Sequence, residues 1–136
     1  MFDMTSCGRC ARSFAYLLLL SVQTVIAADQ DLTGTYSIEA RSKDTLNCKG
    51  AGEIRLIQEG MALNGDGVIS GNCIGGPYHG TVTGFYDGEK FRIVFKSAFS
   101  YSFSSTKEMI SREIIEGAYW GFGGSDSGPA TLTRIE

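Results

Sequence analysis

The chain has 136 residues, of which 43% are hydrophobic and 20% are charged, and its formal net charge at pH 7 is −3. The length fits a single globular domain behind an N-terminal leader. Acidic residues outnumber basic ones and no basic cluster occurs, so the composition provides no attraction for nucleic acid or for an anionic lipid surface.

The first 28 residues have the pattern of a secretory signal peptide. Arg9 and Arg12 precede the apolar run FAYLLLLSVQTVIA, and Ala27 and Ala28 follow as small residues at the exit. This run is shorter than the ~20 residues that a membrane-spanning helix requires. We predict a signal peptide over residues 1–28, a single domain over residues 29–136, no membrane span, and a periplasmic or secreted location.

Export would leave two of the four cysteines, because Cys7 and Cys10 belong to the predicted signal peptide. Cys48 and Cys73 would then lie in an oxidising compartment, which favours a disulfide over two separately buried thiols. In the chain-entropy model a crosslink across a loop of this length contributes ~3 to 4 kcal/mol to stability.

Short runs of alternating apolar and polar residues dominate residues 29–136. In FSYSFS (99–104) the rings fall on one face and the hydroxyls on the other, which is typical of a strand with one solvated face. Glycine-rich turn signals, such as Asp87-Gly88 and Asn64–Gly67, separate the runs. We predict strands over residues 33–40, 52–59, 61–63 with 67–72, 78–86, 90–97, 99–105, 112–122 and 129–135, and at most a helical turn within 105–111.

Strands linked by hairpins must bury their apolar faces, and there is almost no helix to cover them. We therefore expect an all-β fold, a small antiparallel up-and-down β-barrel of about eight strands. The interior of such a barrel holds side chains or one small ligand, and short strands favour a filled interior. If the sheet did not close, its edges could pair, so we expect a monomer or a weak dimer.

Four short segments together resemble small exported bacterial proteins with a lipocalin-like (calycin-type) β-barrel, a group mostly of unknown function. The segments are DLTGTYS (31–37), YHGTVTG (78–84), GAYWG (117–121) and ATLTR (130–134). In such barrels a Gly-x-Trp on the first strand packs against an arginine on the last strand. The resemblance thus assigns barrel closure to Gly34, Tyr36 and Arg134, with tyrosine replacing tryptophan. The alternative is that Arg134 is a solvated terminal residue.

A second resemblance is to exported inhibitors of bacterial metalloproteases. These are small eight-stranded barrels with one disulfide, and their N-terminal arm enters the protease cleft. The segment Leu32–Tyr36 and the two cysteines match them in outline. This resemblance implies an alternative function, a protease-inhibitor-like protein that acts through residues 29–31 and through loops at 74–78 and 122–128.

Several motifs imitate catalytic or metal sites. His79, Asp87 and Ser127 follow the order of a serine-protease triad, but such proteases need two barrels and about twice this length. The segment Asn64–Ser70 imitates a calcium loop but lacks carboxylates at both ends. His79 is the only histidine, so zinc and iron lack ligands. We predict no catalytic residues, no metal and no cofactor.

Aromatic side chains are concentrated in two segments of the chain. They are Phe99, Tyr101, Phe103, Tyr119, Trp120 and Phe122. These rings either fill the core or line a pocket at the barrel mouth for a small apolar or aromatic ligand. We predict an exported, non-catalytic binding module whose partner is a small apolar ligand, an envelope component or an exported protein.

Overall fold

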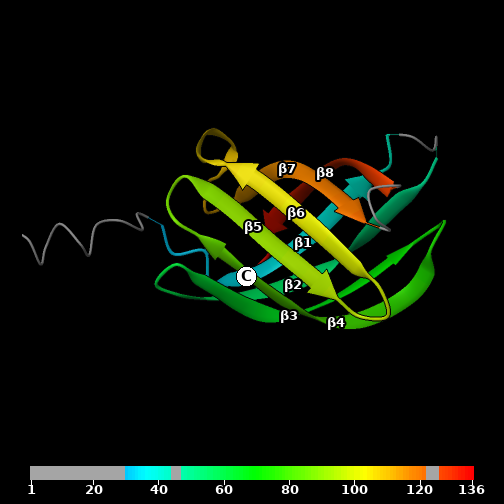
Figure 1. Ribbon diagram of the computed structural model, residues 1–136, viewed down its shortest axis with the longest axis horizontal. Coiled ribbons are helices and arrows are strands. Elements are labelled where there is room, and N and C mark those ends of the chain that lie inside the picture. Colours follow the sequence, from blue (N-terminus) through cyan, green and yellow to red (C-terminus); the bar gives the residue numbers. More distant parts are fainter. Residues whose placement is uncertain (1–29, 44–46, 122–125) are drawn as a thin grey trace, which may run out of the picture.

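A computed structural model describes residues 30–43, 47–121 and 126–136. The strands are β1 (Gly34–Arg41), β2 (Lys49–Glu59), β3 (Ala62–Gly71), β4 (Gly75–Tyr86), β5 (Lys90–Lys96), β6 (Ser100–Thr106), β7 (Ile114–Gly121) and β8 (Asp126–Arg134), with one 3₁₀ turn, η1 (Lys107–Met109). Each strand pairs antiparallel with the next, and β8 pairs with β1, which closes the barrel (Figure 1). The predicted eight-stranded antiparallel barrel is confirmed.

The predicted signal peptide, residues 1–28, lies outside the described residues. In the part of the chain that is described, no helix has the length and apolar character needed to cross a membrane. The predicted helical turn within 105–111 is confirmed by η1.

The prediction of a break at Asn64–Gly67 is wrong, because this segment lies inside the continuous strand β3. The hairpin turn lies earlier, at Gly60, whose φ of +63° favours glycine. A Cβ atom on Gly65 would lie 1.7 Å from the Arg55 carbonyl oxygen, so this glycine permits a close approach between strands. Asp66 faces outward, and its carboxylate lies 2.6 Å from the Arg55 guanidinium.

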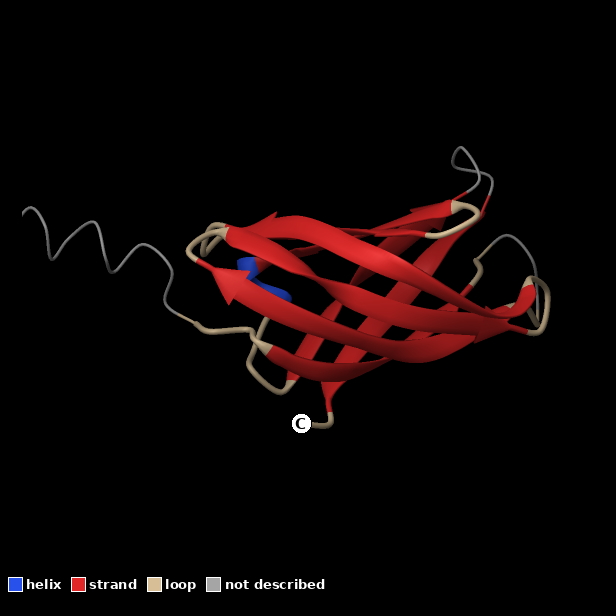
Figure 2. Cartoon of the chain, turned by 90° about the horizontal axis from the view of Figure 1, so that it is seen from below, coloured by secondary structure: helices blue, strands red, loops and turns tan. Residues whose placement is uncertain are grey.

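The barrel has a closed end, where the β2–β3, β4–β5 and β6–β7 connections lie. Figure 2 shows η1 at this end of the barrel. Its core consists of fully or almost fully buried side chains, namely Leu32, Tyr36, Leu56, Leu63, Tyr86, Phe91, Ile110, Ile115 and Leu132. Leu32 precedes β1, and its backbone N–H donates to Gln58 Oε1 at 2.8 Å. The segment that precedes β1 therefore caps this end.

The structure brings the three predicted closure residues together. The Arg134 guanidinium carbon lies 5.0 Å from the centre of the Tyr36 ring, and Arg134 Nη2 donates to the Tyr36 hydroxyl at 2.9 Å. That hydroxyl donates in turn to the Leu32 carbonyl at 2.8 Å. A Cβ on Gly34 would lie 2.1 Å from Arg134 Nη1, so only glycine leaves room for the guanidinium.

Burial raises the pKa of Tyr36, and the positive charge of Arg134 partly opposes that rise. Arg134 also donates from Nε to the Arg112 carbonyl at 2.7 Å and from Nη1 to the Thr33 carbonyl at 2.8 Å. These contacts place Arg134 in a defined network instead of in free solvent. We call Gly34, Tyr36 and Arg134 the closure cluster.

Candidate functional site

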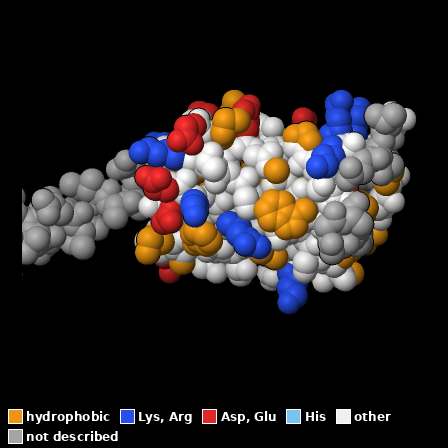
Figure 3. Space-filling model, turned by 45° about the horizontal axis from the view of Figure 1, so that its top comes forward, with side chains coloured by type: hydrophobic (Ala, Val, Ile, Leu, Met, Phe, Trp, Pro, Cys, Tyr) orange, Lys and Arg blue, Asp and Glu red, His pale blue; other side chains and the backbone are white. Residues whose placement is uncertain are grey.

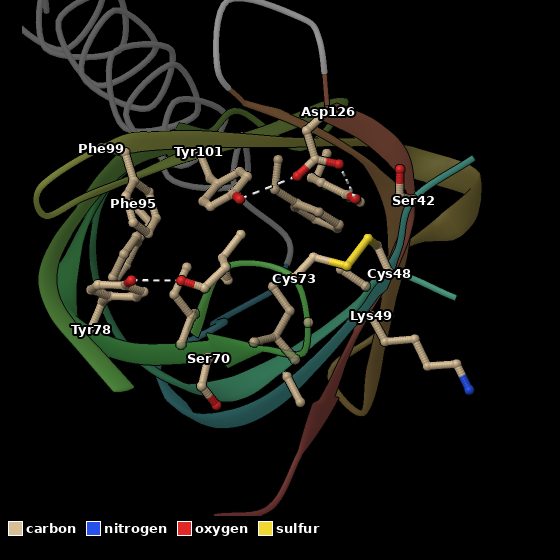
Figure 4. A pocket seen from close by; sticks show the side chains of 18 of the residues that line it. Ser42, Cys48, Lys49, Ser70, Cys73, Tyr78, Phe95, Phe99, Tyr101 and Asp126 are labelled. Atoms are coloured by element: carbon tan, nitrogen blue, oxygen red, sulfur yellow. Dashed lines mark hydrogen bonds between the residues drawn. A yellow bond between two sulfur atoms is a disulfide. The ribbon is translucent and has the colours of Figure 1, made fainter. Parts of the chain in front are cut away.

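The opposite end of the barrel, the open end, contains a cavity of about 560 Å³. Its walls come from the ends of β1, β3, β5 and β7 and the starts of β2, β4, β6 and β8 (Figure 4). Ile38, Ile69, Ile74, Phe95 and Phe99 supply much of the apolar lining. The volume lies within the range of ~300 to 1,000 Å³ that is usual for small-molecule sites.

The expectation of a filled interior is therefore wrong at this end. The inward positions of β1 and β2 carry the small residues Ala40 and Gly50, both in the cavity wall. On β4, a Cβ on Gly80 would lie 2.8 Å from the Phe95 ring. Because glycine leaves that space open, the ring packs against the β4 backbone and leaves the middle of the cavity empty.

Four of the six predicted ligand-lining aromatics do line the cavity, namely Phe99, Tyr101, Phe103 and Tyr119. Three of them form a row of edge-to-face contacts with ring centres 5.2 Å apart for Phe99 and Tyr101 and 5.9 Å apart for Tyr101 and Tyr119. Tyr78 extends the row, with its ring 4.8 Å from Phe99. Phe122 lies outside the described residues.

The prediction that Trp120 lines a ligand site is wrong. Adjacent residues of a strand point to opposite faces, and Tyr119 points inward, so Trp120 lies on the exterior with 37% of its surface exposed. Its ring lies 5.9 Å from the Arg92 guanidinium carbon. On the exterior face in Figure 3, apolar side chains form small separate groups among charged and polar ones.

The polar part of the cavity is built around Asp126, a residue that the sequence analysis did not single out. The Tyr119 hydroxyl donates a hydrogen bond to Asp126 Oδ1 at 2.9 Å, and the Tyr101 hydroxyl donates one to Asp126 Oδ2 at 3.2 Å (Figure 4). Burial raises the pKa of Tyr101, and the neighbouring Asp126 carboxylate raises it further. The Tyr101 hydroxyl therefore remains a neutral donor toward the carboxylate.

Asp126 was missed because the last strand was predicted to begin at residue 129. The Gly-Ser-Asp-Ser-Gly segment at 124–128 has turn composition, yet β8 begins at Asp126. Tyr78 was missed as a lining residue too, and its hydroxyl donates to the Ile74 carbonyl at 2.6 Å. Its inward position could have been found by extending the alternation of β4 back from Val82.

The predicted disulfide between Cys48 and Cys73 is confirmed, with a Cα–Cα distance of 5.5 Å. Both cysteines line the cavity. Asn72 supports the same junction, because its Oδ1 accepts from the Lys49 N–H at 2.7 Å and its Nδ2 donates to the Asn47 carbonyl. The crosslink thus ties the start of β2 to the β3–β4 connection at the rim.

The residues that imitate a protease triad are not brought together. Asp87 lies at the closed end, where its Oδ1 accepts the backbone N–H groups of Glu89 and Lys90 and thereby lowers its own pKa. Ser127 lies at the open end on β8, and His79 is exposed on β4. No three His, Cys, Asp or Glu side chains of the described residues form a group that could hold a metal ion.

The segments that the protease-inhibitor resemblance assigned to partner binding are partly built into the barrel where the structure describes them, although Gly75–Pro77 are exposed. Asp31 is exposed, and its Oδ1 accepts the Thr33 N–H at 3.0 Å, which lowers the Asp31 pKa. The next residue, Leu32, is fully buried. In the 74–78 segment, both Ile74 and Tyr78 belong to the cavity wall.

No protein-family model and no curated protein matches the sequence. Among solved structures, the chain is similar to a redesigned β-barrel, mFAP1, bound to DFHBI, with a TM-score of 0.63 and 15% identity over 79% of this chain and 99% of that one. It is also similar to a de novo designed fluorescence-activating β-barrel, with a TM-score of 0.60 and 14% identity over 75% of this chain and 92% of that one. These similarities show the barrel fold, and the lipocalin-like family remains a prediction.

Proposed function

We propose that the protein is an exported, non-catalytic binding protein that holds a small, largely apolar ligand in the open-end cavity. The observation that carries this proposal is the cavity of about 560 Å³ with an apolar and aromatic lining, in a barrel whose other end is packed. A designed barrel of similar fold binds DFHBI, which supports a small ligand as the occupant here.

Binding without catalysis agrees with the side chains in the cavity wall. Among the described lining residues there is no histidine, and both cysteines are joined in the disulfide. The described wall thus offers no Ser–His or Cys–His pairing of a nucleophile with a general base. The disulfide itself supports export, because such bonds persist in oxidising compartments.

The proposal is tested by titrating the purified protein with N-phenyl-1-naphthylamine, a neutral apolar probe, and following its fluorescence. We expect saturable binding to the wild type. Ala40→Phe places a ring in the cavity wall and should weaken binding about tenfold or more, since a filled cavity excludes the probe.

Ala118→Phe is the matched control, because Ala118 lies exposed on β7 and the same side chain is added outside the barrel. This variant should bind the probe like the wild type. If folded Ala40→Phe binds as tightly as Ala118→Phe, the probe does not occupy the cavity, and the proposal is wrong.

A further inference from the structure

The charge inside the cavity comes from a single half-buried carboxylate. Among the described residues that line the cavity, only Asp126 and Lys49 carry a full charge. Lys49 is exposed, and its ammonium group points away from the cavity (Figure 4). Within the described part of the chain the ion pair that forms is Arg55–Asp66, on the exterior. None of the described lining residues therefore places a cation beside the Asp126 carboxylate.

The two tyrosines position this carboxylate without neutralising it. Each Asp126 oxygen accepts one hydrogen bond, Oδ1 from the Tyr119 hydroxyl and Oδ2 from the Tyr101 hydroxyl. A carboxylate offers about four lone-pair sites, so about two remain for another donor. Because charge interactions strengthen where solvent is partly excluded, this group attracts a cationic ligand and repels an anionic one.

The neighbouring rings suit the same kind of ligand. Phe99, Tyr101 and Tyr119 stand edge to face along one wall, beside Asp126. Aromatic faces attract a nearby cation, and the attraction grows when the cation is desolvated. Ile38, Ile69 and Ile74 on the other walls provide apolar surface for an uncharged body.

We infer that the cavity selects apolar or aromatic ligands that carry a protonated amine, with the ammonium group bound by Asp126 between Tyr101 and Tyr119. The inference rests on the proposed function, since it names the ligand class of the same cavity. Alternative ligand classes of similar shape are neutral alcohols and carboxylates.

Three probes with one naphthalene body separate these classes: 1-naphthylmethylamine, 1-naphthylmethanol and 1-naphthoate. Calorimetric titration at pH 7 should give the tightest binding for the amine, about tenfold or more above the alcohol, as expected for a charge-assisted hydrogen bond. The naphthoate should bind most weakly. This ranking is measured on the wild-type protein and needs no variant.

Asp126→Asn keeps the shape of the side chain and removes its charge. This variant should bring the affinity for the amine close to that for the alcohol when both are measured on the same variant. Asp66→Asn is the control, because it removes a carboxylate of β3 from the exterior of the barrel, and it should preserve the ranking.

The two proposals fail in different ways. If none of the three probes binds, or if Ala40→Phe binds them like the wild type, the cavity is not a ligand site and the proposed function is wrong. If the alcohol or the naphthoate binds as tightly as the amine, the cavity holds ligands but the inference is overturned. It is also overturned if Asp126→Asn retains the preference for the amine.

Discussion

The two ends of this barrel use similar side chains in opposite ways. At the closed end Tyr36 is fully buried, and its hydroxyl joins Leu32 and Arg134 in a network that fills the space. At the open end Tyr101 and Tyr119 stand around a cavity and donate to Asp126. The same continuous sheet thus encloses a packed core at one end and a cavity at the other.

This contrast indicates that the size of the inward side chains decides whether a small barrel is hollow. Inward positions of the closed end carry residues such as Leu56, Leu63 and Phe91. Inward positions of the open end include the small residues Ala40 and Gly50, and the larger side chains there, such as Phe95 and Tyr101, stand around the cavity. Strand number fixes the diameter of the barrel, but the volume left inside depends on the side chains that enter it.

The greatest loss of stability is expected from substitutions at the closed end. Tyr36→Ala should lower the free energy of unfolding by ~3 to 5 kcal/mol, because it removes a fully buried ring. Arg134→Ala should also lower the free energy of unfolding. The double variant should lose less free energy than the sum of the two single losses, since the side chains are in contact. Urea denaturation measures all three.

If the losses in free energy of unfolding of Tyr36→Ala and Arg134→Ala are additive in the double variant, the two residues do not stabilise each other. The interpretation of the closure cluster as a stabilising contact would then be wrong. Under conditions where Tyr36→Ala is still folded, its affinity for a neutral cavity probe should match the wild type. This control separates damage to the closed end from damage to the cavity.

A loss almost as large is expected at the open end. Replacing both cysteines, Cys48→Ser with Cys73→Ser, should lower stability by ~3 to 4 kcal/mol, because the crosslink limits the unfolded chain. Unlike the closed-end variants, this one should also weaken probe binding, since both sulfurs lie in the cavity wall.

Reductant provides the control for the disulfide. It should lower the unfolding midpoint of the wild type and leave the midpoint of the double serine variant unchanged. If the double serine variant unfolds at the same midpoint as the oxidised wild type, the disulfide does not stabilise the rim.

The smallest effects come from two inward glycines that differ in the space around them. A Cβ on Gly80 would lie 2.4 Å from the Lys96 carbonyl oxygen and 2.8 Å from the Phe95 ring, so Gly80→Ala should cost ~1 to 3 kcal/mol. A Cβ on Gly50 would meet only the Ser70 carbonyl oxygen, at 3.6 Å. Gly50→Ala should therefore change stability by no more than ~0.5 kcal/mol.

Thermal denaturation of the two alanine variants is the measurement. Equal losses would mean that the contact between Gly80 and the Phe95 ring does not set the cost of the added methyl group.

The fold was predictable because its signals are local. Two-residue alternation placed the strands, and the segment 99–105 was displaced from the true strand Ser100–Thr106 by a single residue. The disulfide followed from the two cysteines that remain after the predicted signal peptide. The strand break predicted at Asn64–Gly67 was wrong because glycine occurs both at turns and where strands approach closely.

The site was only partly predictable, because it depends on which face each residue takes and on contacts between distant segments. Tyr101 and Asp126 are 25 residues apart and meet only when β6, β7 and β8 pair. Trp120 was predicted to line the ligand site together with Tyr119, although adjacent residues of a strand point to opposite faces. The emptiness of the cavity could not be predicted, since it is the volume that remains after the whole barrel has packed.

The pairing of β1 with β8, from Tyr36 opposite Arg134 to Ala40 opposite Ala130, has a consequence for assembly. Every strand in the described part of the chain has a neighbour on both sides, so the expected route to a dimer through unpaired sheet edges does not exist there. In the described barrel a foreign segment meets no wholly unpaired edge strand, which is the usual template for strand addition of the kind that seeds amyloid. What the described barrel presents to its surroundings is therefore side chains on the outer surface and the loops at the rim.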